Sequence, residues 1–299
     1  MKNGKKMLGL ILTTMIALTF MIGCSKDTDN TIVIGSKNYN EALVLGNMYA
    51  SLLEANTDLN IVRKLNLGGT NVAFQALKNG SIDLYPEYTG TGYVSIMGKT
   101  AIGDTKKVYD AMKEYYNDEL DIAVLTPLGF NNTYAMAVRK DTAEKYNLKT
   151  CSDLAKVSDE LVLGSTFEFA EREDGYLGMK KVYNMEFKDS KSVDGALRYT
   201  ALANGNSDVI DAFTTDGLLK MFDLVVLDDD LGFFPPYHGV PIVRNETIKK
   251  HPEVKVQLER LGGLVDEKAM IEMNYLVDKE GQDPENVADN FLRTNGLID

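Results

Sequence analysis

Two stretches of the chain, 125 residues apart, share a pattern that favours a fold of two similar halves. Residues 76–83 read ALKNGSID and residues 201–208 read ALANGNSD, so each ends a predicted helix with Asn-Gly and enters a strand through an aspartate. Asn-Gly alone is a common helix end, because glycine adopts the left-handed conformation readily. Five residues beyond each aspartate, however, comes an aromatic residue followed by threonine, first at Tyr88 and then at Phe213. The matched spacing predicts two similar α/β lobes.

Strand-like and helix-like segments alternate along most of the chain, and such alternation predicts parallel sheets covered by helices. Ligands bind outside the carboxyl ends of the strands in open sheets of this kind, so Tyr88 and Phe213 are expected to face one shared cleft. From Asn245 onward the pattern is nearly all helical. Predicted strands lie at residues 31–35, 60–67, 81–85, 161–166, 207–213 and 225–229, and predicted helices at residues 41–55, 71–80, 176–185 and 195–205.

The start of the chain carries the pattern of an export signal. Three lysines precede an uncharged run over residues 7–23, and Cys24 follows this run directly. A positive segment, an apolar stretch and small residues are typical of a secretory signal peptide. The ending resembles a bacterial lipobox, although Met21 stands where leucine is usual. We therefore expect a signal peptide over 1–23, lipidation of Cys24 and a polar tether over 24–30, with an uncleaved anchor or ordinary secretion as alternatives.

Charge and motif content argue against several classes of function. The net charge is −12, with 32 Lys and Arg against 44 Asp and Glu, and nucleic acid requires clustered cations instead. The chain has two histidines, His238 and His251, and lacks the H-E-x-x-H, G-x-S-x-G and Walker motifs. Of the two cysteines, Cys151 has no partner for a disulfide if Cys24 is lipidated. We expect no catalysis, no metal and no cofactor.

Aromatic residues gather in three short regions of the sequence, and any one ring alone is commonly part of a core. Together they have a specific use. A quaternary ammonium group has no N–H to donate, whereas the faces of aromatic rings attract it electrostatically, by about 0.5–1 kcal/mol per exposed contact and about 2 kcal/mol when desolvated. The rings therefore suggest a cage for a choline-like cation. The three groups are Tyr85, Tyr88 and Tyr93; Tyr134 after FNNT; and Phe233, Phe234 and Tyr237 around Pro-Pro.

Several long motifs occur in order along the chain: IGSKNYNEALVLGNMYASLLE, LGGT, ALKNGSIDLYPEYTGT, LGFNNTYAMAV, DAFTTDG and FFPPY. From about Thr31 to the C-terminus the sequence resembles the substrate-binding proteins of osmoprotectant ABC transporters, which bind glycine betaine, carnitine, choline and related solutes. This resemblance implies a two-lobed periplasmic-binding-protein fold of type II, with a central ligand cleft and a hinge. We expect lobe 1 over residues 31–133 and 239–299, and lobe 2 over residues 134–238.

The resemblance also implies the residues of an ammonium cage. Asn132 of FNNTY matches a family position that contacts the cationic head through its backbone carbonyl. Phe213 stands where many relatives have tyrosine, so its ring face is retained but any contact through a hydroxyl is lost. The four rings implied as the cage are Tyr88, Tyr134, Phe213 and Tyr237.

Three further residues match family positions that hold the carboxylate of the ligand: Lys37, Thr91 and Arg172. The forked donors of a guanidinium suit a carboxylate, and the neutral Thr91 tolerates one where an acid would repel it. Glu168 lies one helical turn before Arg172, so it is expected either to latch the lobes together or to form an ordinary surface ion pair. Tyr85 is expected to be scaffold.

These features predict a monomeric extracytoplasmic receptor, lipid-anchored at the cell membrane. It would close on a small quaternary ammonium solute and deliver it to the permease subunit of an ABC transporter. Glycine betaine or carnitine is favoured, and choline stays open. The alternatives are a receptor of the same fold for another small amine or amino acid, and an exported enzyme on this fold.

Overall fold

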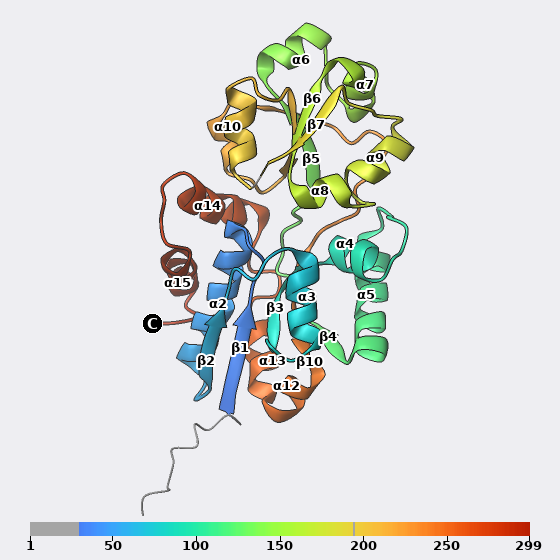
Figure 1. Cartoon of the computed structure of the whole chain (residues 1–299). Helices are drawn as coiled ribbons and strands as arrows, with labels where there is room; N and C mark the ends of the chain where they lie inside the picture. The colour runs from blue at the N-terminus through green and yellow to red at the C-terminus, as the bar shows by residue number, and fades with distance from the viewer. Residues whose placement is uncertain (1–29, 194) are drawn as a thin grey trace, which may run out of the picture. The chain divides into compact units, whose positions relative to one another are not determined.

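The computed structural model describes residues 30–193 and 195–299 of the chain (Figure 1). The predicted signal peptide, the lipidation site Cys24 and the tether up to residue 29 lie outside these residues. Within the described part, none of the helices combines the length and the apolar character that crossing a bilayer requires.

The first half of the molecule is built on a five-stranded sheet with the order β2-β1-β3-β10-β4. β1 and β3 are parallel, whereas β10 is antiparallel to both of its neighbours. The reason is that β10 begins beside the last residue of β3, with Gly239 opposite Tyr88, as the chain returns from the other half. The strands are β1 (Thr31–Gly35), β2 (Asn60–Lys64), β3 (Leu84–Tyr88), β4 (Ile122–Val124) and β10 (Gly239–Arg244).

The second half contains another five-stranded sheet, whose order β7-β6-β8-β5-β9 repeats the connectivity of the first. Here β5 is the antiparallel strand, paired with β8 and β9, because it carries the chain in from the first half. The prediction of parallel sheets is therefore wrong for β5 and β10, and both sheets are mixed. The strands are β5 (Tyr134–Val138), β6 (Val162–Ser165), β7 (Asp189–Ser192), β8 (Val209–Phe213) and β9 (Val225–Leu227).

Helices cover both sheets (Figure 1). In the first half, α13, α14 and α15 pack on the long buried helix α2, so the predicted helical C-terminal third completes this half. Its helices are α2 (Asn40–Asn56), α3 (Thr70–Lys78), α4 (Thr89–Thr91), the π-helical turn η2 (Gly92–Ile96), α5 (Thr105–Leu120), α12 (Asn245–Lys250), α13 (Pro252–Glu259), α14 (Glu267–Asp278) and α15 (Pro284–Thr294). Those of the second half are α6 (Lys140–Tyr146), α7 (Cys151–Ala155), the 3-10 turn η3 (Ser158–Glu160), α8 (Phe167–Glu171), α9 (Tyr176–Val182), α10 (Leu197–Ala203) and α11 (Leu218–Met221).

The repeated sequence has the same structure in both halves. An asparagine caps the C-terminus of both α3 and α10, and the glycine that follows is left-handed, with φ of 74° at Gly80 and 72° at Gly205. Asp83 and Asp208 then each accept a hydrogen bond from a main-chain N–H of the neighbouring strand, at 2.8 and 3.0 Å. The prediction of two similar α/β halves is confirmed.

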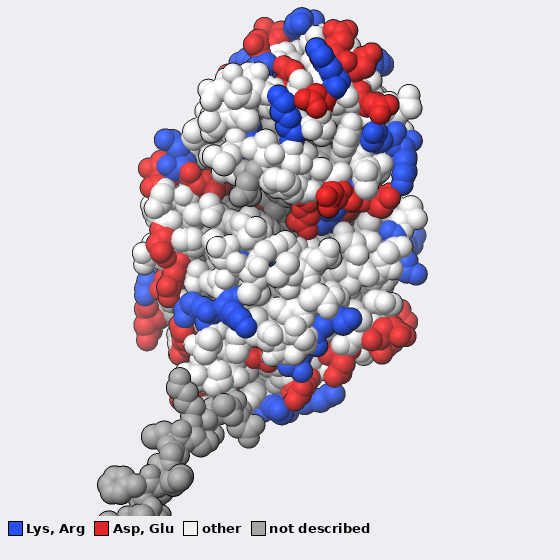
Figure 2. All heavy atoms as spheres, in the orientation of Figure 1, with Lys and Arg blue, Asp and Glu red and all other residues white. Residues whose placement is uncertain are grey.

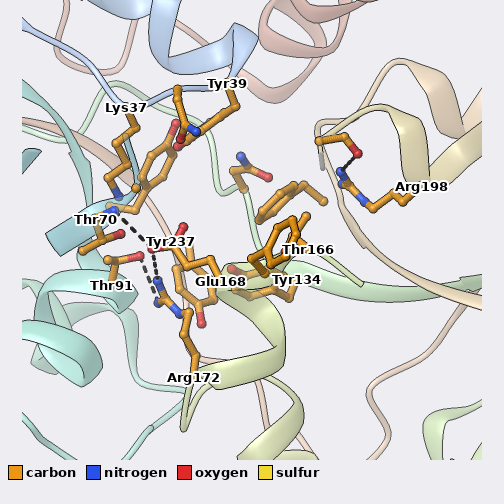
Figure 3. A pocket seen from close by; sticks show the side chains of 17 residues that line it. Lys37, Tyr39, Thr70, Thr91, Tyr134, Thr166, Glu168, Arg172, Arg198 and Tyr237 are labelled. Carbon is orange, nitrogen blue, oxygen red and sulfur yellow. Dashed lines mark hydrogen bonds and ion pairs between the residues drawn. The ribbon is translucent and has the colours of Figure 1, made fainter. Parts of the chain in front are cut away.

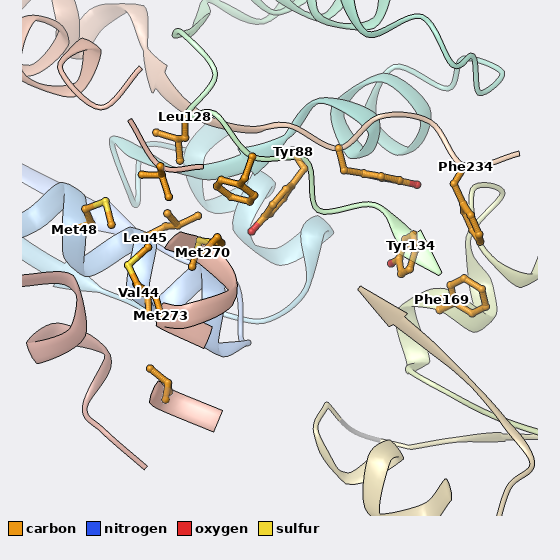
Figure 4. Packing of buried hydrophobic residues seen from close by; sticks show 14 of the residues in the cluster. Val44, Leu45, Met48, Tyr88, Leu128, Tyr134, Phe169, Phe234, Met270 and Met273 are labelled. Carbon is orange, nitrogen blue, oxygen red and sulfur yellow. The ribbon is translucent and has the colours of Figure 1, made fainter. Parts of the chain in front are cut away.

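A single hydrophobic cluster runs through both halves. In the first half it packs α2 and α14 against Tyr88, and in the second it joins Tyr134 to Phe169 and Phe234 (Figure 4). Aromatic residues expected in a binding site are thus continuous with the core, which fixes their positions. On the surface, acidic and basic side chains are interspersed over the face shown in Figure 2.

The two left-handed glycines give a matched test of the repeat. Gly205→Ala should lower the free energy of unfolding by about 1–2 kcal/mol, because an L-residue is strained in this conformation and open space surrounds the added methyl. Gly80→Ala should cost a similar amount, since its Cβ would lie 2.6 Å from Nη1 at the far end of the flexible Arg244 side chain, which can move aside. Thermal unfolding checks both, with Gly103→Ala, which has no positive φ and no neighbour within 4 Å, as the control. A loss at position 80 or 205 no larger than that of Gly103→Ala would contradict the expected backbone strain.

Candidate ligand-binding site

A cavity of about 230 Å³ lies between the ends of β3 and β8 (Figure 3). It is close to the two segments that join the halves, residues 125–133 between β4 and β5 and residues 228–238 between β9 and β10. Its wall contains every residue that the sequence predicted as a ligand contact, although these residues are spread over 200 positions of the chain. Glu168 also lines it. The eight predicted contacts brought together here are Lys37, Tyr88, Thr91, Asn132, Tyr134, Arg172, Phe213 and Tyr237.

Three of the four predicted rings are in direct contact. The ring centroid of Tyr134 lies 4.7 Å from that of Phe213 and 5.5 Å from that of Tyr237, which is perpendicular to it. Tyr88 connects to them through Tyr39, whose ring lies 6.3 Å from Tyr88 and 6.4 Å from Phe213. These separations are typical of interacting aromatic rings. Tyr39 therefore belongs to the ring cluster, and the sequence analysis did not assign it a role.

Strand pairing explains how these rings meet. Tyr134 is the first residue of β5 and lies opposite Phe213, the last residue of β8, so the two rings share one end of the second sheet. Tyr88 occupies the corresponding last position of β3. Tyr237 precedes β10 and lies against Gly90, where a Cβ would approach the ring to 2.7 Å. The glycine of the YTGT motif is thus required for Tyr237 to reach the cavity.

Lys37 is buried and forms an ion pair with the equally buried Glu87, with 2.5 Å between Nζ and Oε1. Glu87 also accepts hydrogen bonds from the hydroxyl of Tyr85 and the main-chain N–H of Tyr88, each at 2.8 Å. Tyr85 is fully buried in the core and does not line the cavity, as the prediction of a scaffold role requires. An ammonium has three donor positions, so Lys37 retains capacity for a further acceptor.

Asp174 holds the guanidinium of Arg172 in place by accepting hydrogen bonds from its Nε at 2.7 Å and its Nη2 at 2.5 Å. Asp174 is fully buried and also accepts the hydroxyl of Tyr237 at 2.6 Å. The same Nη2 of Arg172 donates to the hydroxyl of Thr91 at 3.3 Å, and Thr91 belongs to the first half. The guanidinium of Arg172 therefore contacts Thr91 of the first half directly and is linked to Tyr237 through Asp174.

Glu168 of α8 also joins the two halves. Its Oε1 accepts a hydrogen bond from the main-chain N–H of Thr70, the first residue of α3, at 3.2 Å, and lies 3.4 Å from Nη1 of Arg172. A carboxylate is favoured at a helix N-terminus. Burial raises the pKa of Glu168, but the charges of Lys37 and Arg172 and the N–H of Thr70 lower it more, so the pKa falls below its ordinary value.

Arg198 is a third cation on the cavity wall, and the sequence analysis missed it. It is buried and donates to Asp216 at 2.8 Å and to the main-chain oxygen of Asp211 at 2.6 Å. Each cation of the wall lies over an aromatic ring. The distances to the ring centroids are 5.3 Å for Lys37 over Tyr88, 5.8 Å for Arg172 over Tyr134 and 5.6 Å for Arg198 over Phe213.

Asn132 lines the cavity from the first of the joining segments. Its main-chain N–H donates to the carbonyl of Tyr237 at 3.0 Å, which ties the two joining segments together. Its side-chain Nδ2 donates to the buried Glu41 at 2.7 Å, and the hydroxyl of Tyr88 donates to the same oxygen at the same distance. Glu41 was another residue to which the sequence gave no role.

Aromatic faces and cations around a cavity between two hinged α/β halves define a two-lobed solute-binding protein. Residues 30–294 match the family model described as the substrate binding domain of ABC-type glycine betaine transport system, and the chain belongs to this family. The resemblance and the fold class predicted from the sequence are thereby confirmed, and so is the functional class, a substrate-binding protein of ABC transport.

Individual relatives support the same assignment. The chain is 37% identical over 294 residues to the carnitine transport binding protein OpuCC of Listeria monocytogenes, covering 97% of this chain and 96% of that one. It is also 37% identical over 271 residues to the ergothioneine transport permease/ergothioneine binding protein EgtU of Helicobacter pylori, covering 90% of this chain and 48% of that protein. A solved structure of a glycine betaine/carnitine/choline ABC transporter covers 90% of this chain and is itself fully covered, with a TM-score of 0.73 and 34% identity.

The buried pair of Arg172 and Asp174 can be tested directly. Asp174→Ala should lower the free energy of unfolding by about 3–5 kcal/mol, because it leaves a buried guanidinium without its partner. The adjacent Glu173→Ala removes an exposed ion pair with Lys181 and should cost at most about 1 kcal/mol. Urea unfolding of both variants measures the difference. Similar losses of unfolding free energy in the two variants would show that Asp174 does not neutralise the buried charge of Arg172.

Proposed function

We propose that the protein captures small solutes that carry both a quaternary ammonium and a carboxylate, such as glycine betaine and carnitine. The observation that carries this proposal is the meeting of aromatic rings and three cations, Lys37, Arg172 and Arg198, around one cavity. Ring faces suit the methylated nitrogen, which donates no hydrogen bond, and the cations suit the carboxylate. The cavity of about 230 Å³ favours a small solute, since pockets for drug-sized ligands measure roughly 300–1,000 Å³.

In this proposal Tyr88, Tyr134, Phe213 and Tyr237 form the ammonium cage, together with Tyr39, which the sequence analysis did not include. Asn132 contacts the cationic head through its carbonyl. Lys37, Thr91 and Arg172 bind the carboxylate, a contact that a bare cation such as choline does not make. Arg198 adds positive potential from the second half.

Closure of the two halves over the ligand completes the proposed mechanism. The contacts of Glu168 with Thr70 and of Arg172 with Thr91 support the closed arrangement, because each joins the two halves beside the cavity. We assign lobe 1 to residues 31–133 and 239–299 and lobe 2 to residues 134–238, with Glu168 as the latch. A ligand shifts the equilibrium toward closure only if it binds the closed form more tightly.

Membership of the family supports a role in delivering the bound solute to a transporter. We propose that the closed protein, as a monomer, docks on the permease subunit of an ABC transporter, and that it acts without catalysis. The signal peptide over 1–23 and lipidation at Cys24 would hold it at the extracytoplasmic face of the cell membrane. A receptor for another amine or amino acid is the alternative, and aromatic substitutions discriminate between the two.

Removing two cage rings tests the ligand class. The purified protein should bind at least one of glycine betaine, carnitine, choline, proline betaine and ergothioneine with low-millimolar or better affinity in calorimetric titrations. The combined variant Tyr88→Ala and Tyr134→Ala should weaken that binding by about a thousandfold, equivalent to roughly 2 kcal/mol for each desolvated ring. The matched control, Tyr146→Ala with Tyr275→Ala, removes two tyrosines outside the cavity and should bind as the unmodified protein does. Unchanged affinity in the cage variant would favour the alternative receptor.

Thr91 offers a test of the carboxylate contact. Thr91→Asp places a negative charge where the ligand carboxylate is proposed to lie, and the new carboxylate also competes for Arg172. Titrations should show at least a tenfold loss of affinity for glycine betaine and carnitine, while choline, which has no carboxylate, is retained or improved. Thr91→Asn, which is neutral and similar in size, is the control. A parallel loss for all solutes would place the carboxylate elsewhere.

A further inference from the structure

Glu41 lies in the first turn of α2 and is 4% exposed, yet four side-chain donors surround its carboxyl group. Oε1 accepts hydrogen bonds from the hydroxyl of Tyr88 and from Nδ2 of Asn132, and Oε2 accepts from the hydroxyl of Thr215 and from Nδ2 of Asn274. All four donor–acceptor distances are 2.7 Å. The four donors come from four different parts of the fold.

The surroundings of Glu41 suit an ionised carboxyl group, although none of the four donors is a cation. A carboxylate accepts from all four donors at once, whereas a protonated carboxyl group would have to donate to the hydroxyl of Tyr88 or Thr215 and lose the hydrogen bond that this hydroxyl gives. Burial raises the pKa of Glu41 above its ordinary value, and the hydrogen bonds of Thr215, Tyr88, Asn274 and Asn132 counteract this effect only in part. The position in the first turn of a helix also favours negative charge.

The carboxylate of Glu41 determines the orientation of two side-chain amides. Asn132 and Asn274 both turn their NH₂ groups to Glu41, and the side-chain oxygens of both are buried without a hydrogen-bond partner among the described residues. A buried oxygen without a partner is unfavourable, so the hydrogen bonds to Glu41 determine which way each amide faces. Asn132 lines the cavity, and its orientation therefore depends on Glu41.

The donors also belong to different halves of the molecule. Tyr88 ends β3 in the first half, and Thr215 lies in the loop that follows Phe213 at the end of β8 in the second half. Nδ2 of Asn274, from α14, donates in addition to the main-chain oxygen of Thr215 at 3.0 Å. One carboxylate thus connects a ring of the cage, the joining segment and the second half.

We propose that Glu41 is a positioning residue for ligand binding, which fixes Tyr88 and Asn132 in the cavity wall and couples them to the second half through Thr215. This inference rests on the proposed function. Glu41 does not itself line the cage cavity and acts through the side chains that do. Its effect is expected on ligand affinity in addition to the stability of the fold.

The first test is Glu41→Gln. An NH₂ group then replaces one carboxylate oxygen and cannot accept the two hydrogen bonds that this oxygen receives. The dissociation constant for the tightest-binding solute of the panel should rise at least tenfold in calorimetric titrations. Glu54→Gln, near the other end of the same helix, changes an exposed carboxylate and should bind as the unmodified protein does. An unchanged dissociation constant in a folded Glu41→Gln variant would overturn the proposal.

A double-mutant cycle with Tyr88→Phe separates positioning from a merely structural role. Tyr88→Phe keeps the ring face and removes the hydroxyl that donates to Glu41. If Glu41 acts on the ligand through this hydroxyl, the double variant should lose less affinity than the product of the two single losses. Fully multiplicative losses would mean that the two residues act independently, which contradicts the proposal.

Two further measurements cover the remaining outcomes. If Glu41→Gln does not fold, Thr215→Val removes a single donor from the second half and should still raise the dissociation constant severalfold, and no change would overturn the coupling. If the unmodified protein binds none of the solutes, the proposed function fails, and positioning is measured without ligand. The near-ultraviolet circular dichroism of the tyrosines should then change in Glu41→Gln but not in Glu54→Gln, and an unchanged spectrum would overturn the proposal.

Discussion

Buried carboxylates behind the cavity wall hold its cations and hydroxyls, and the shape of the site depends on them. Glu87 pairs with Lys37, and Asp174 binds both Arg172 and Tyr237. A buried cation that loses its partner is strongly destabilising, so these side chains cannot turn away from their acids at low cost. The part of the wall within each half is thus held in place, and a preorganised site loses less free energy to ordering when it binds.

The repeat explains why such a site lies between the two halves. Both sheets have the same strand order, and the strands β3 and β8 end in the aromatic residues Tyr88 and Phe213. The antiparallel strands β5 and β10 begin where these strands end, because there the chain crosses from one half to the other. The crossing segments therefore place Tyr134 and Tyr237 beside these two aromatic residues. A change in the angle between the halves would alter the arrangement of all four rings together.

The cations of the wall bear on which solutes the cavity selects. Each of the three lies over a ring of the proposed cage, so part of the aromatic surface already contacts positive charge within the protein. Each of these cations is paired with an acidic residue, so in the proposed function they select a solute whose own carboxylate accepts their remaining hydrogen bonds, which a bare cation cannot do. The same reasoning applies to the neutral Thr91, because an acid at this position would repel the carboxylate of the solute. In the proposed function, specificity comes from repulsion as well as attraction.

Local patterns in the sequence were enough to predict the alternation of strands and helices and the two similar halves, whereas the residues around the cavity were implied by the resemblance to a known family. Glycine and aspartate at matched positions, such as Gly80 and Gly205, encode the same turn twice, and a motif that extends over many residues carries its site with it. The direction of β5 and β10 was decided only by the tertiary structure, because it depends on where the chain crosses between halves. The same holds for Tyr39, Arg198 and Glu41, since their partners are distant in sequence and no local periodicity records a contact between side chains that only folding brings together.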